Sequence, residues 1–282
     1  MSETRRALLK QAGERLAAQG IETAVLDARL LFQAASGSRH EDIVVDPDLV
    51  VPPEVAARFS MFIERRCRFE PVSRILGTRE FYGRSFRVTP DVLDPRADTE
   101  TLIGAALGLV KGKGAFRILD LGTGSGAIAV TLLAELPGAT AVAGDLSAAA
   151  LAVAKGNAEA LGVACRASFV QANWFEGIGG KFDLIVSNPP YIPLGDIAGL
   201  APDVREFDPA RALDGGPDGL EAYRRLANGA GGHLAPSGRV VLEIGAGQEN
   251  AVNELFTRQG FARESRHFDL AGHARCLVFS WP

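Results

Sequence analysis

The run Asn188-Pro189-Pro190-Tyr191 combines residue types that can hold a planar nitrogen group. The Asn188 side-chain oxygen and the Pro189 carbonyl can each accept a hydrogen bond from an –NH₂ group, and Tyr191 offers a ring face for stacking. The prolines fix their own φ and restrict the residue before each, so the run is stiff. An amide or aromatic amino nitrogen has a delocalised lone pair, so its orientation is the main catalytic task. We therefore predict Asn188, Pro189 and Tyr191 as catalytic residues, against the plainer alternative of an ordinary Asn-Pro turn.

A glycine-rich stretch lies earlier in the chain, Asp120-Leu121-Gly122-Thr123-Gly124-Ser125-Gly126. Glycines allow a close approach of the backbone to a ligand, and the helix expected next offers free N–H groups at its start. Asp145 lies at the end of the second expected strand, where a carboxylate can accept hydrogen bonds from both hydroxyls of a ribose. The plain alternative is a tight turn without a ligand.

Two cofactors fit the glycine-rich stretch. Gly122, Gly124 and Ala127 satisfy the relaxed dinucleotide fingerprint, which is a weak signal alone. The acidic residue two positions before the first glycine makes the stretch resemble a loop that binds S-adenosylmethionine, whose ammonium group suits a nearby carboxylate. The two runs together predict a methyltransferase that uses this cofactor and acts on a planar nitrogen. A second glycine pair, at Gly245 and Gly247, lacks a suitable downstream carboxylate, and we expect a plain turn there.

Both runs need strands to position them. Strands and helices alternate from about residue 101, which predicts a doubly wound, mostly parallel sheet with ligands at the carboxyl ends of its strands. The last two strands have no helix between them, so we expect an antiparallel edge. The expected strands are 117–121, 140–146, 167–172, 182–187, 239–244, 261–269 and 275–281.

The N-terminal part has a different pattern, with apolar residues at helical spacing. The predicted organisation is a helical domain over 1–70, a hairpin linker over 71–100 and a methyltransferase domain over 101–282. The expected buried faces of the helices are Leu8, Leu9, Ala12 and Leu16, then Leu26, Leu30, Leu31 and Ala34, and then Val55, Phe59, Phe62 and Ile63.

Composition excludes several classes of protein. The chain has 282 residues, of which 47% are hydrophobic and 23% charged, and this is typical of a folded protein. It has no apolar run long enough to span a membrane and begins with no secretory signal, so we expect a cytoplasmic protein. The net charge of −4 disfavours stable binding of nucleic acid. A local basic patch stays open, formed by Arg65, Arg66, Arg68, Arg74, Arg79 and Arg84.

The cysteines give no metal site. Cys67, Cys165 and Cys276 lie far apart in the chain, and the four histidines have no ligand spacing relative to them. We expect packed thiols and no metal.

Further stretches carry a resemblance to one family. They are Pro71-Val72, Gly77-x-x-Glu80-Phe81, Pro95-Arg96-x-Asp98-Thr99-Glu100 and Ala212-Leu213-Asp214-Gly215-Gly216-x-Asp218-Gly219-Leu220. With the two runs above they resemble the peptide chain release factor N(5)-glutamine methyltransferases, the HemK or PrmC family. The resemblance covers essentially the whole chain.

This resemblance implies methylation of the glutamine side chain in the Gly-Gly-Gln motif of bacterial class-1 release factors. S-adenosylmethionine would be the donor and S-adenosylhomocysteine the product, without a metal. The substrate glutamine would be held by Asn188 through Tyr191. The implied cofactor-binding residues are Gly122, Thr123, Gly124, Ser125, Gly126, Asp145, Trp174 and Asn188. For Trp174, a simple core position is the alternative.

The chain departs from the family pattern at Ala97, Asn173 and Asp208, where Pro, Asp and Glu are usual. Other activities remain as alternatives: methylation of adenine or guanine in nucleic acid, which for a duplex requires base extrusion, or of a glutamine in a ribosomal protein. A cofactor-binding adaptor is a non-enzymatic alternative that the intact Asn188–Tyr191 run disfavours. How the helical domain contacts a release factor, and the oligomeric state, stay open.

Overall fold

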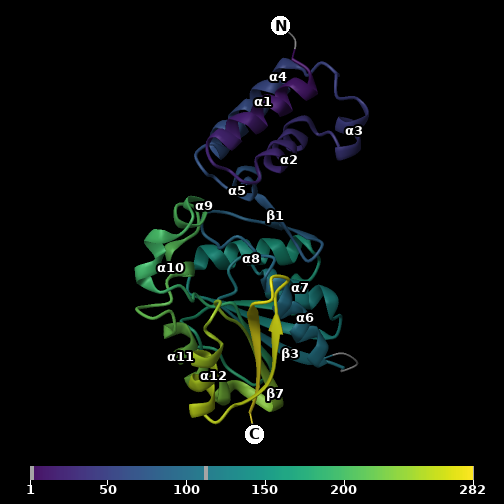
Figure 1. The fold of residues 1–282 in the computed structure, drawn as a ribbon. Helices are drawn as coiled ribbons and strands as arrows, with labels where there is room; N and C mark the ends of the chain where they lie inside the picture. The colour runs from purple at the N-terminus through teal and green to yellow at the C-terminus, as the bar shows by residue number, and fades with distance from the viewer. Residues whose placement is uncertain (1–2, 111–113, 282) are drawn as a thin grey trace. The chain divides into compact units, whose positions relative to one another are not determined.

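The computed structural model describes residues 3–110 and 114–281 (Figure 1). These residues divide into two compact units. One consists of the chain up to Thr78 together with Ala201–Phe207, and the other consists of Arg79–Leu200 and the chain from Asp208 onwards. In the described part of the chain, no helix is both long and apolar enough to cross a membrane.

The first unit is helical. Its core contains Leu16, Leu31 and Phe59, and the rings of Phe32 and Phe59 meet edge to face with centroids 5.3 Å apart. Such aromatic contacts add to the free energy gained by burying the rings. Its helices are α1 (Arg5–Ala18), α2 (Ala24–Ser36), α3 (His40–Val45), α4 (Pro53–Arg66), α5 (Val72–Leu76) and α9 (Pro202–Arg205).

The buried face of α2 differs from the predicted one. Leu26 and Leu30 are 54% and 39% exposed and Ala34 is exposed, so of the predicted face only Leu31 is buried. The buried set is Ala24, Asp27, Ala28, Leu31, Phe32 and Ala35. Apolar residues surround most of this helix, so two faces satisfy the helical spacing. The observed face buries the large Phe32 ring and brings Asp27 to the Arg66 guanidinium at 2.7 Å.

A two-stranded sheet lies in the segment for which the sequence predicts a hairpin. It consists of β1 (Thr78–Phe81) and β2 (Arg84–Arg87). The two residues between the strands, Tyr82 and Gly83, both have positive φ, 50° and 69°. This backbone conformation matches the right-handed twist of paired strands, and it explains a two-residue connection.

The second unit is built on a seven-stranded sheet, as far as the described residues show, with the order β5-β4-β3-β6-β7-β9-β8. Neighbouring strands from β5 through β7 are parallel, whereas β9 is antiparallel to both β7 and β8. The predicted mostly parallel sheet with an antiparallel edge is confirmed. The strands are β3 (Phe116–Leu121), β4 (Ala139–Asp145), β5 (Ala167–Gln171), β6 (Phe182–Ser187), β7 (Leu234–Glu243), β8 (Ala262–Phe268) and β9 (Ala274–Ser280).

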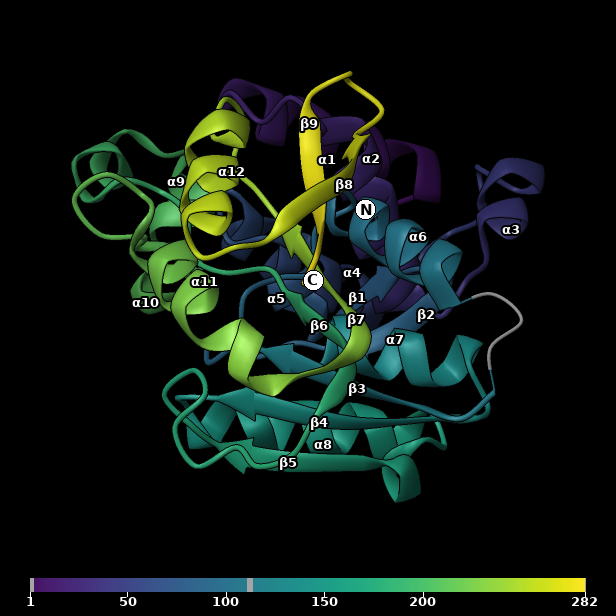
Figure 2. The same cartoon turned by 90° about the horizontal axis from the view of Figure 1, so that it is seen from below.

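Helices cover both faces of this sheet (Figure 2). On one face α6 (Thr99–Val110), α7 (Ala127–Glu135) and α8 (Ala148–Ala160) enclose a core that includes Ile118. On the other face α11 (Glu221–His233) and α12 (Glu249–Arg258) enclose a core that includes Leu119. Strands buried on both faces are rich in consecutive apolar residues, such as Ile118-Leu119 in β3 and Leu184-Ile185-Val186 in β6.

The strand order reverses beside β3. The chain passes from β3 outward to β4 and β5 and then returns to β6 on the other side of β3. At such a point the loops after neighbouring strands separate in opposite directions and leave a crevice at the carboxyl ends. Both runs singled out in the sequence follow these strands.

Candidate active site

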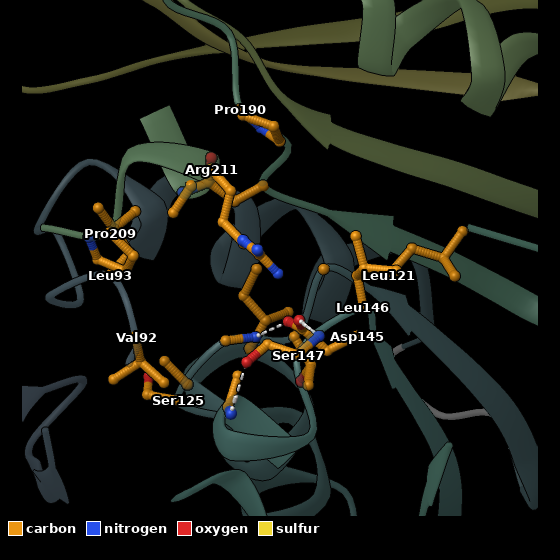
Figure 3. Close-up of a pocket in the computed structure, with 18 of the residues that line it drawn as sticks. Val92, Leu93, Leu121, Ser125, Asp145, Leu146, Ser147, Pro190, Pro209 and Arg211 are labelled. Atoms are coloured by element: carbon orange, nitrogen blue, oxygen red, sulfur yellow. Dashed lines mark hydrogen bonds between the residues drawn. The ribbon is translucent and has the colours of Figure 1, made fainter. Parts of the chain in front are cut away.

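A cavity of about 200 Å³ lies at the carboxyl ends of β3 and β4 and in front of the loop after β6 (Figure 3). Most of the predicted site residues meet in its lining. These are Gly122, Thr123, Gly124, Ser125, Asp145, Trp174, Asn188 and Pro190. Gly126, Pro189 and Tyr191 are not part of the lining.

The glycine loop has a backbone conformation that is unfavourable for residues with a Cβ atom. Gly122, Gly124 and Gly126 have φ of 72°, 55° and 81°. At Gly126 an added Cβ would also lie 3.1 Å from the Ala154 Cβ, so space and backbone both require glycine. Gly126 is the residue before α7, and it lets α7 and α8 approach closely.

Asp120 organises this loop from beneath. Its side chain is fully buried, and Oδ2 accepts hydrogen bonds from the Thr123 hydroxyl at 2.7 Å and the Ala129 N–H at 3.1 Å. Its Oδ1 has no hydrogen-bond partner among the described residues. Burial raises the pKa of Asp120 to about 7, because the charged form loses its hydration. Asp120 does not line the cavity, so its effect on a bound cofactor passes through the loop.

Asp145 ends β4 and joins two loops. Its Oδ2 accepts from the Gly124 N–H at 2.9 Å, and its Oδ1 accepts from the Ser147 N–H at 2.8 Å (Figure 3). Ser147 in turn caps α8, since its hydroxyl accepts from the Ala150 N–H. Each carboxylate oxygen keeps lone-pair capacity for a further donor. The carboxylate is thus fixed at the cavity wall and can accept hydroxyl groups.

The position of Trp174 agrees with both of the interpretations that the sequence left open. It packs against the core between the sheet and α11 and also lines the cavity. Its φ of 57° is uncommon for a large side chain and indicates a position that the surrounding structure imposes. Its neighbour Asn173 also lines the cavity.

The loop after β6 presents one end of the Asn188 side chain to the cavity. The Asn188 Nδ2 donates to the Thr99 hydroxyl at 3.1 Å, and among the described residues no hydrogen bond engages Oδ1. Pro190 lines the cavity beside it, whereas Pro189 is buried. An –NH₂ group placed in the cavity would therefore meet a free acceptor at Asn188.

Tyr191 lies behind this loop. Its ring packs so close to Gly245 that a Cβ there would lie 3.0 Å from the Tyr191 Cδ2. Burial raises the pKa of Tyr191 to about 12, and the negative charge of Glu243 acts in the same direction. Gly245, the first glycine of the second pair, thus makes room for the tyrosine ring, and it lies outside the cavity lining.

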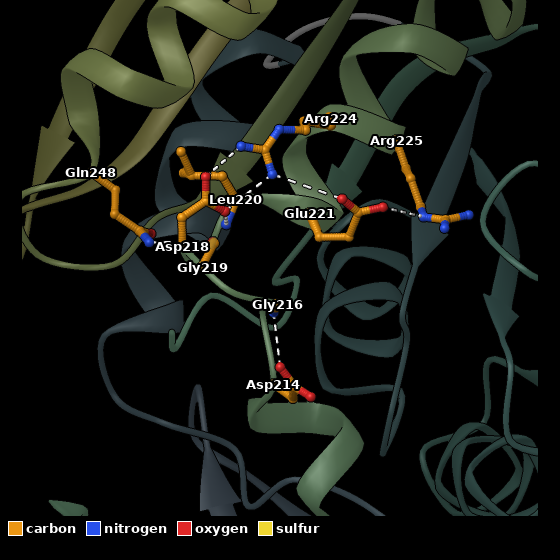
Figure 4. A network of polar contacts seen from close by, with 9 residues as sticks. All are labelled: Asp214, Gly216, Asp218, Gly219, Leu220, Glu221, Arg224, Arg225 and Gln248. Atoms are coloured by element: carbon orange, nitrogen blue, oxygen red, sulfur yellow. Dashed lines mark hydrogen bonds and ion pairs between the residues drawn. The ribbon is translucent and has the colours of Figure 1, made fainter. Parts of the chain in front are cut away.

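Hydrogen bonds from the segment after the loop and from the Gln248 side chain hold the Asn188–Tyr191 loop in place. The Ile192 N–H donates to the Leu213 carbonyl at 3.1 Å, and the Gly215 N–H donates back to the Ile192 carbonyl at 2.9 Å. Gln248 Nε2 donates to the carbonyls of Tyr191 and Gly219, at 2.9 and 3.3 Å. Figure 4 shows Gln248 beside Gly219 in the network that also contains Asp214 and Asp218. The stretch Ala212–Leu220, noted in the sequence only for its resemblance, therefore supports the Asn188–Tyr191 loop.

Sequence reasoning missed several residues of the site. Arg211 lines the cavity, and its side chain extends into it (Figure 3). Glu243, at the end of β7, is 1% exposed and lies near Asn188 and Thr99. A single acidic residue inside the apolar run Val240–Ile244 was the available signal for Glu243.

The structure weakens the candidate basic patch. Arg65, Arg66 and Arg84 form ion pairs with Glu70, Asp27 and Glu135. Their charges are therefore partly neutralised within the protein, and fewer are available for phosphate groups. Among residues 3–110 and 114–281, no cluster of three His, Cys, Asp or Glu side chains could hold a metal ion.

The whole chain matches known proteins. Models of the PrmC N-terminal domain and of the methyltransferase small domain match residues 7–77 and 106–197. A release factor glutamine methyltransferase of Cereibacter sphaeroides is 50% identical and covers 97% of each chain. A relative of the same name from Rhodospirillum rubrum is 47% identical and covers 96% of this chain and 83% of its own. One from Moorella thermoacetica is 42% identical and covers 98% of each chain.

The chain belongs to the release factor glutamine methyltransferase family. The resemblance seen in the sequence is thereby confirmed, and with it the identification as an enzyme.

Solved structures of other methyltransferases share the fold of this family member. The catalytic domain of hMettl16, in complex with hairpin 6 of the MAT2A 3'UTR, superposes with a TM-score of 0.61 at 18% identity. It covers 76% of this chain and 84% of its own. The T. thermophilus 16S rRNA N2 G1207 methyltransferase, in complex with AdoMet and guanosine, gives 0.52 at 20% identity and covers 73% and 50%. At these identities the likeness concerns the fold alone.

The three residues that depart from the usual family pattern each take part in local hydrogen bonds. Asp208 keeps a carboxylate that accepts from the Arg96 guanidinium at 2.5 Å. Ala97 is exposed, and its carbonyl accepts from the Glu100 N–H at the start of α6. Asn173 stands where the family usually has an acidic residue, and its Nδ2 donates to the Glu176 carboxylate at 3.2 Å.

Proposed function

We propose that this protein transfers the methyl group of S-adenosylmethionine to the side-chain amide nitrogen of a glutamine. We further propose that this glutamine lies in the Gly-Gly-Gln motif of bacterial class-1 release factors. The observation that carries the proposal is that one cavity contains both the glycine loop with Asp145 and the free acceptor end of Asn188. The near full-length similarity to release factor glutamine methyltransferases supports the choice of substrate.

The cavity fits the cofactor. Asp145 offers a fixed carboxylate for the ribose hydroxyls, and the loop Gly122–Gly126 allows a close approach of the backbone. Trp174 supplies an aromatic side chain at the wall for the adenine base. When bound, S-adenosylmethionine supplies an electrophilic methyl group that needs no further activation. No metal is required by this assignment.

The protein contributes orientation and electrostatic stabilisation. The Asn188 Oδ1 and the Pro189 carbonyl would accept the two N–H groups of the substrate amide and direct its lone pair toward the cofactor. These acceptors also stabilise the positive charge that develops on the nitrogen. The methylated nitrogen is acidic enough to lose its extra proton to water, so the account uses no general base. Tyr191, whose ring packs against Gly245 outside the cavity, would hold the loop and with it Asn188 in place.

A methylation assay with an altered substrate tests this function. Purified protein and S-adenosylmethionine are incubated with a release factor, and with the same factor carrying Asn in place of the Gly-Gly-Gln glutamine. Mass spectrometry of the peptides measures the product. The proposal predicts one added methyl group on that glutamine and none on the variant. An unmodified release factor, or equal modification of the variant, would contradict it.

The alternatives are less well supported. The nucleic-acid methyltransferases named above share the fold at 18% and 20% identity. Similarity at this level does not identify the substrate of this protein. The paired arginines and the net charge of −4 also disfavour binding of nucleic acid. A ribosomal protein substrate would use the same site chemistry, and the relatives at 42–50% identity are named for release factors.

A further inference from the structure

A buried carboxyl group lies behind the Asn188 side chain. Glu243 is at the carboxyl end of β7, the strand next to β6, and is 1% exposed. The Thr99 hydroxyl and the Asn188 amide lie close to it and favour its charged form. Its Oε2 has no hydrogen-bond partner among the described residues. An acidic group in such a position is costly to bury, so it needs an explanation other than packing.

The donor and acceptor ends of an asparagine amide differ by a half turn of the side chain. An ionised carboxylate accepts hydrogen bonds and donates none. If the Thr99 hydroxyl donates its hydrogen to the Glu243 carboxylate, the Thr99 oxygen can only accept a hydrogen bond from Asn188. The 3.1 Å hydrogen bond from the Asn188 Nδ2 to this oxygen agrees with that arrangement. Nδ2 therefore faces Thr99 and Glu243, and Oδ1 faces away from them.

We propose that Glu243, acting directly and through Thr99, is a positioning residue that holds the Asn188 amide with its oxygen toward the substrate. This inference rests on the proposed function, because it assigns a purpose to the acceptor end of Asn188. Glu243 itself does not line the cavity, so we assign it no direct contact with cofactor or substrate.

The surroundings of Glu243 make this device sensitive to pH. Burial raises the pKa of Glu243 to about 7, while Thr99, Asn188 and the positive charge of Arg275 oppose the rise. Arg275 and Cys276 approach it from β9, Asp98 from the segment before α6, Tyr191 from the loop after β6 and Tyr223 from α11. A protonated Glu243 can itself donate a hydrogen bond. Below this pH it therefore no longer requires Thr99 and Asn188 to act as donors, and the orientation of the Asn188 amide is no longer fixed.

Kinetics of Glu243→Gln provide the first test. Glutamine has the same shape but carries a donor and an acceptor, so it no longer selects one orientation of Asn188. With saturating release factor and S-adenosylmethionine, we expect kcat to fall about tenfold or more, a typical cost of losing one orienting group. The Kd for S-adenosylmethionine should stay unchanged. The matched control is Glu254→Gln, the same change at an exposed position on α12, which should retain the wild-type kcat.

The pH profile separates positioning from simple structural support. Wild-type kcat should fall as the pH drops below about 7, and Glu243→Gln should lack this fall. Asp120 also has a pKa of about 7, but it supports the cofactor loop, so its titration should affect the Kd for the cofactor. A Glu243→Gln enzyme with wild-type kcat and pH profile would overturn the proposal. So would a loss of activity explained entirely by weaker cofactor binding.

A second pair of variants tests the role of the Thr99 hydroxyl. Thr99→Val removes the hydroxyl at nearly constant volume, whereas Thr99→Ser keeps it. We expect kcat to fall in Thr99→Val and to be largely retained in Thr99→Ser. Equal activity of the two variants would contradict the relay through Thr99.

An activity-independent measurement distinguishes this inference from the proposed function. In ¹⁵N-labelled full-length protein, the Asn188 side-chain amide signals are assigned by their absence in Asn188→Ala. These signals should shift with pH around a midpoint near 7 in the wild type, but not in Glu243→Gln. A missing shift refutes the positioning role even if release factor is methylated. A clear shift upholds the link between Glu243 and Asn188 even if the substrate proves to be another.

Discussion

At the residue scale, three carboxyl groups of the second unit differ in their surroundings and therefore in the roles that they suit. Asp145 is partly exposed, and both of its oxygens accept backbone N–H groups. Asp120 and Glu243 are buried, and each has one oxygen without a hydrogen-bond partner in the part of the chain that the structure describes. Burial raises the pKa of both to about 7. The exposed carboxylate suits ligand contact, and the buried ones shape the loops.

The raised pKa of Glu243 has a consequence for stability. The folded protein retains this proton up to about pH 7, whereas the unfolded chain loses it near pH 4. The stabilising contribution is thus complete below about pH 4 and lost as the pH rises through 7. Relative to wild type, Glu243→Gln should therefore gain stability between pH 5 and pH 8, on the order of 2 kcal/mol. Urea unfolding at both pH values measures this; a difference independent of pH would refute the assigned ionisation.

Asn188 carries the main prediction at this scale. Asn188→Ala removes the acceptor that orients the substrate amide, so kcat should fall about 10²- to 10³-fold. The side chain is only partly buried, so the melting temperature should change little. Asn250→Ala, at an exposed position next to the start of α12, is the control and should behave as the wild type. Turnover retained in Asn188→Ala would disprove the role given to this residue.

At the element scale, the parallel strands explain how distant residues meet. Gly122–Gly126 follow β3, Asp145 is the last residue of β4, and Asn188 follows β6. The carboxyl ends of these strands share one edge of the sheet. This grouping could be predicted, because apolar strands followed by polar or glycine-rich turns are visible in the sequence. The position of Tyr191 could not be predicted. It depends on space that Gly245 leaves after β7, and the pairing of β6 with β7 is not visible in a local pattern.

The two glycines after β7 allow a matched test of this support. In Gly245→Ala the new Cβ would lie 2.7 Å from the Gln248 Oε1 and 3.0 Å from the Tyr191 ring. Gly247 has φ of 82° with nothing within 4 Å, so Gly247→Ala brings only backbone strain, a cost of about 1 kcal/mol. We expect Gly245→Ala to lower kcat strongly, and Gly247→Ala to lower the melting temperature while kcat is kept. Equal kcat values in the two variants would show that Tyr191 does not depend on this contact.

At the scale of the whole molecule, the sheet and its antiparallel edge followed from the alternation of strands and helices. The helical nature of the N-terminal part followed from apolar spacing in the same way. The buried face of α2 did not, because apolar residues surround that helix and only its neighbours decide which of them are covered. Glu243 was missed for a related reason, since its partners Thr99 and Asn188 lie far away in the sequence.

The charge of the whole chain and the pairing of its arginines bear on the partner. The net charge of −4 and the ion pairs of Arg65, Arg66 and Arg84 reduce the positive charge that the candidate patch offers to phosphate groups. We therefore expect methyl transfer to a release factor to tolerate salt better than a reaction on nucleic acid would, since phosphate binding weakens steeply with salt. Initial rates at increasing salt concentration measure this, and a steep loss of rate would contradict it.

One competition experiment tests the central claim most directly. The protein is incubated with methyl-labelled S-adenosylmethionine and with a release factor, ribosomal proteins, tRNA and DNA, each separately and then together. We expect label on the release factor, at the glutamine of its Gly-Gly-Gln motif, and loss of that label in Asn188→Ala. Label on nucleic acid or on a ribosomal protein, with none on the release factor, would contradict it.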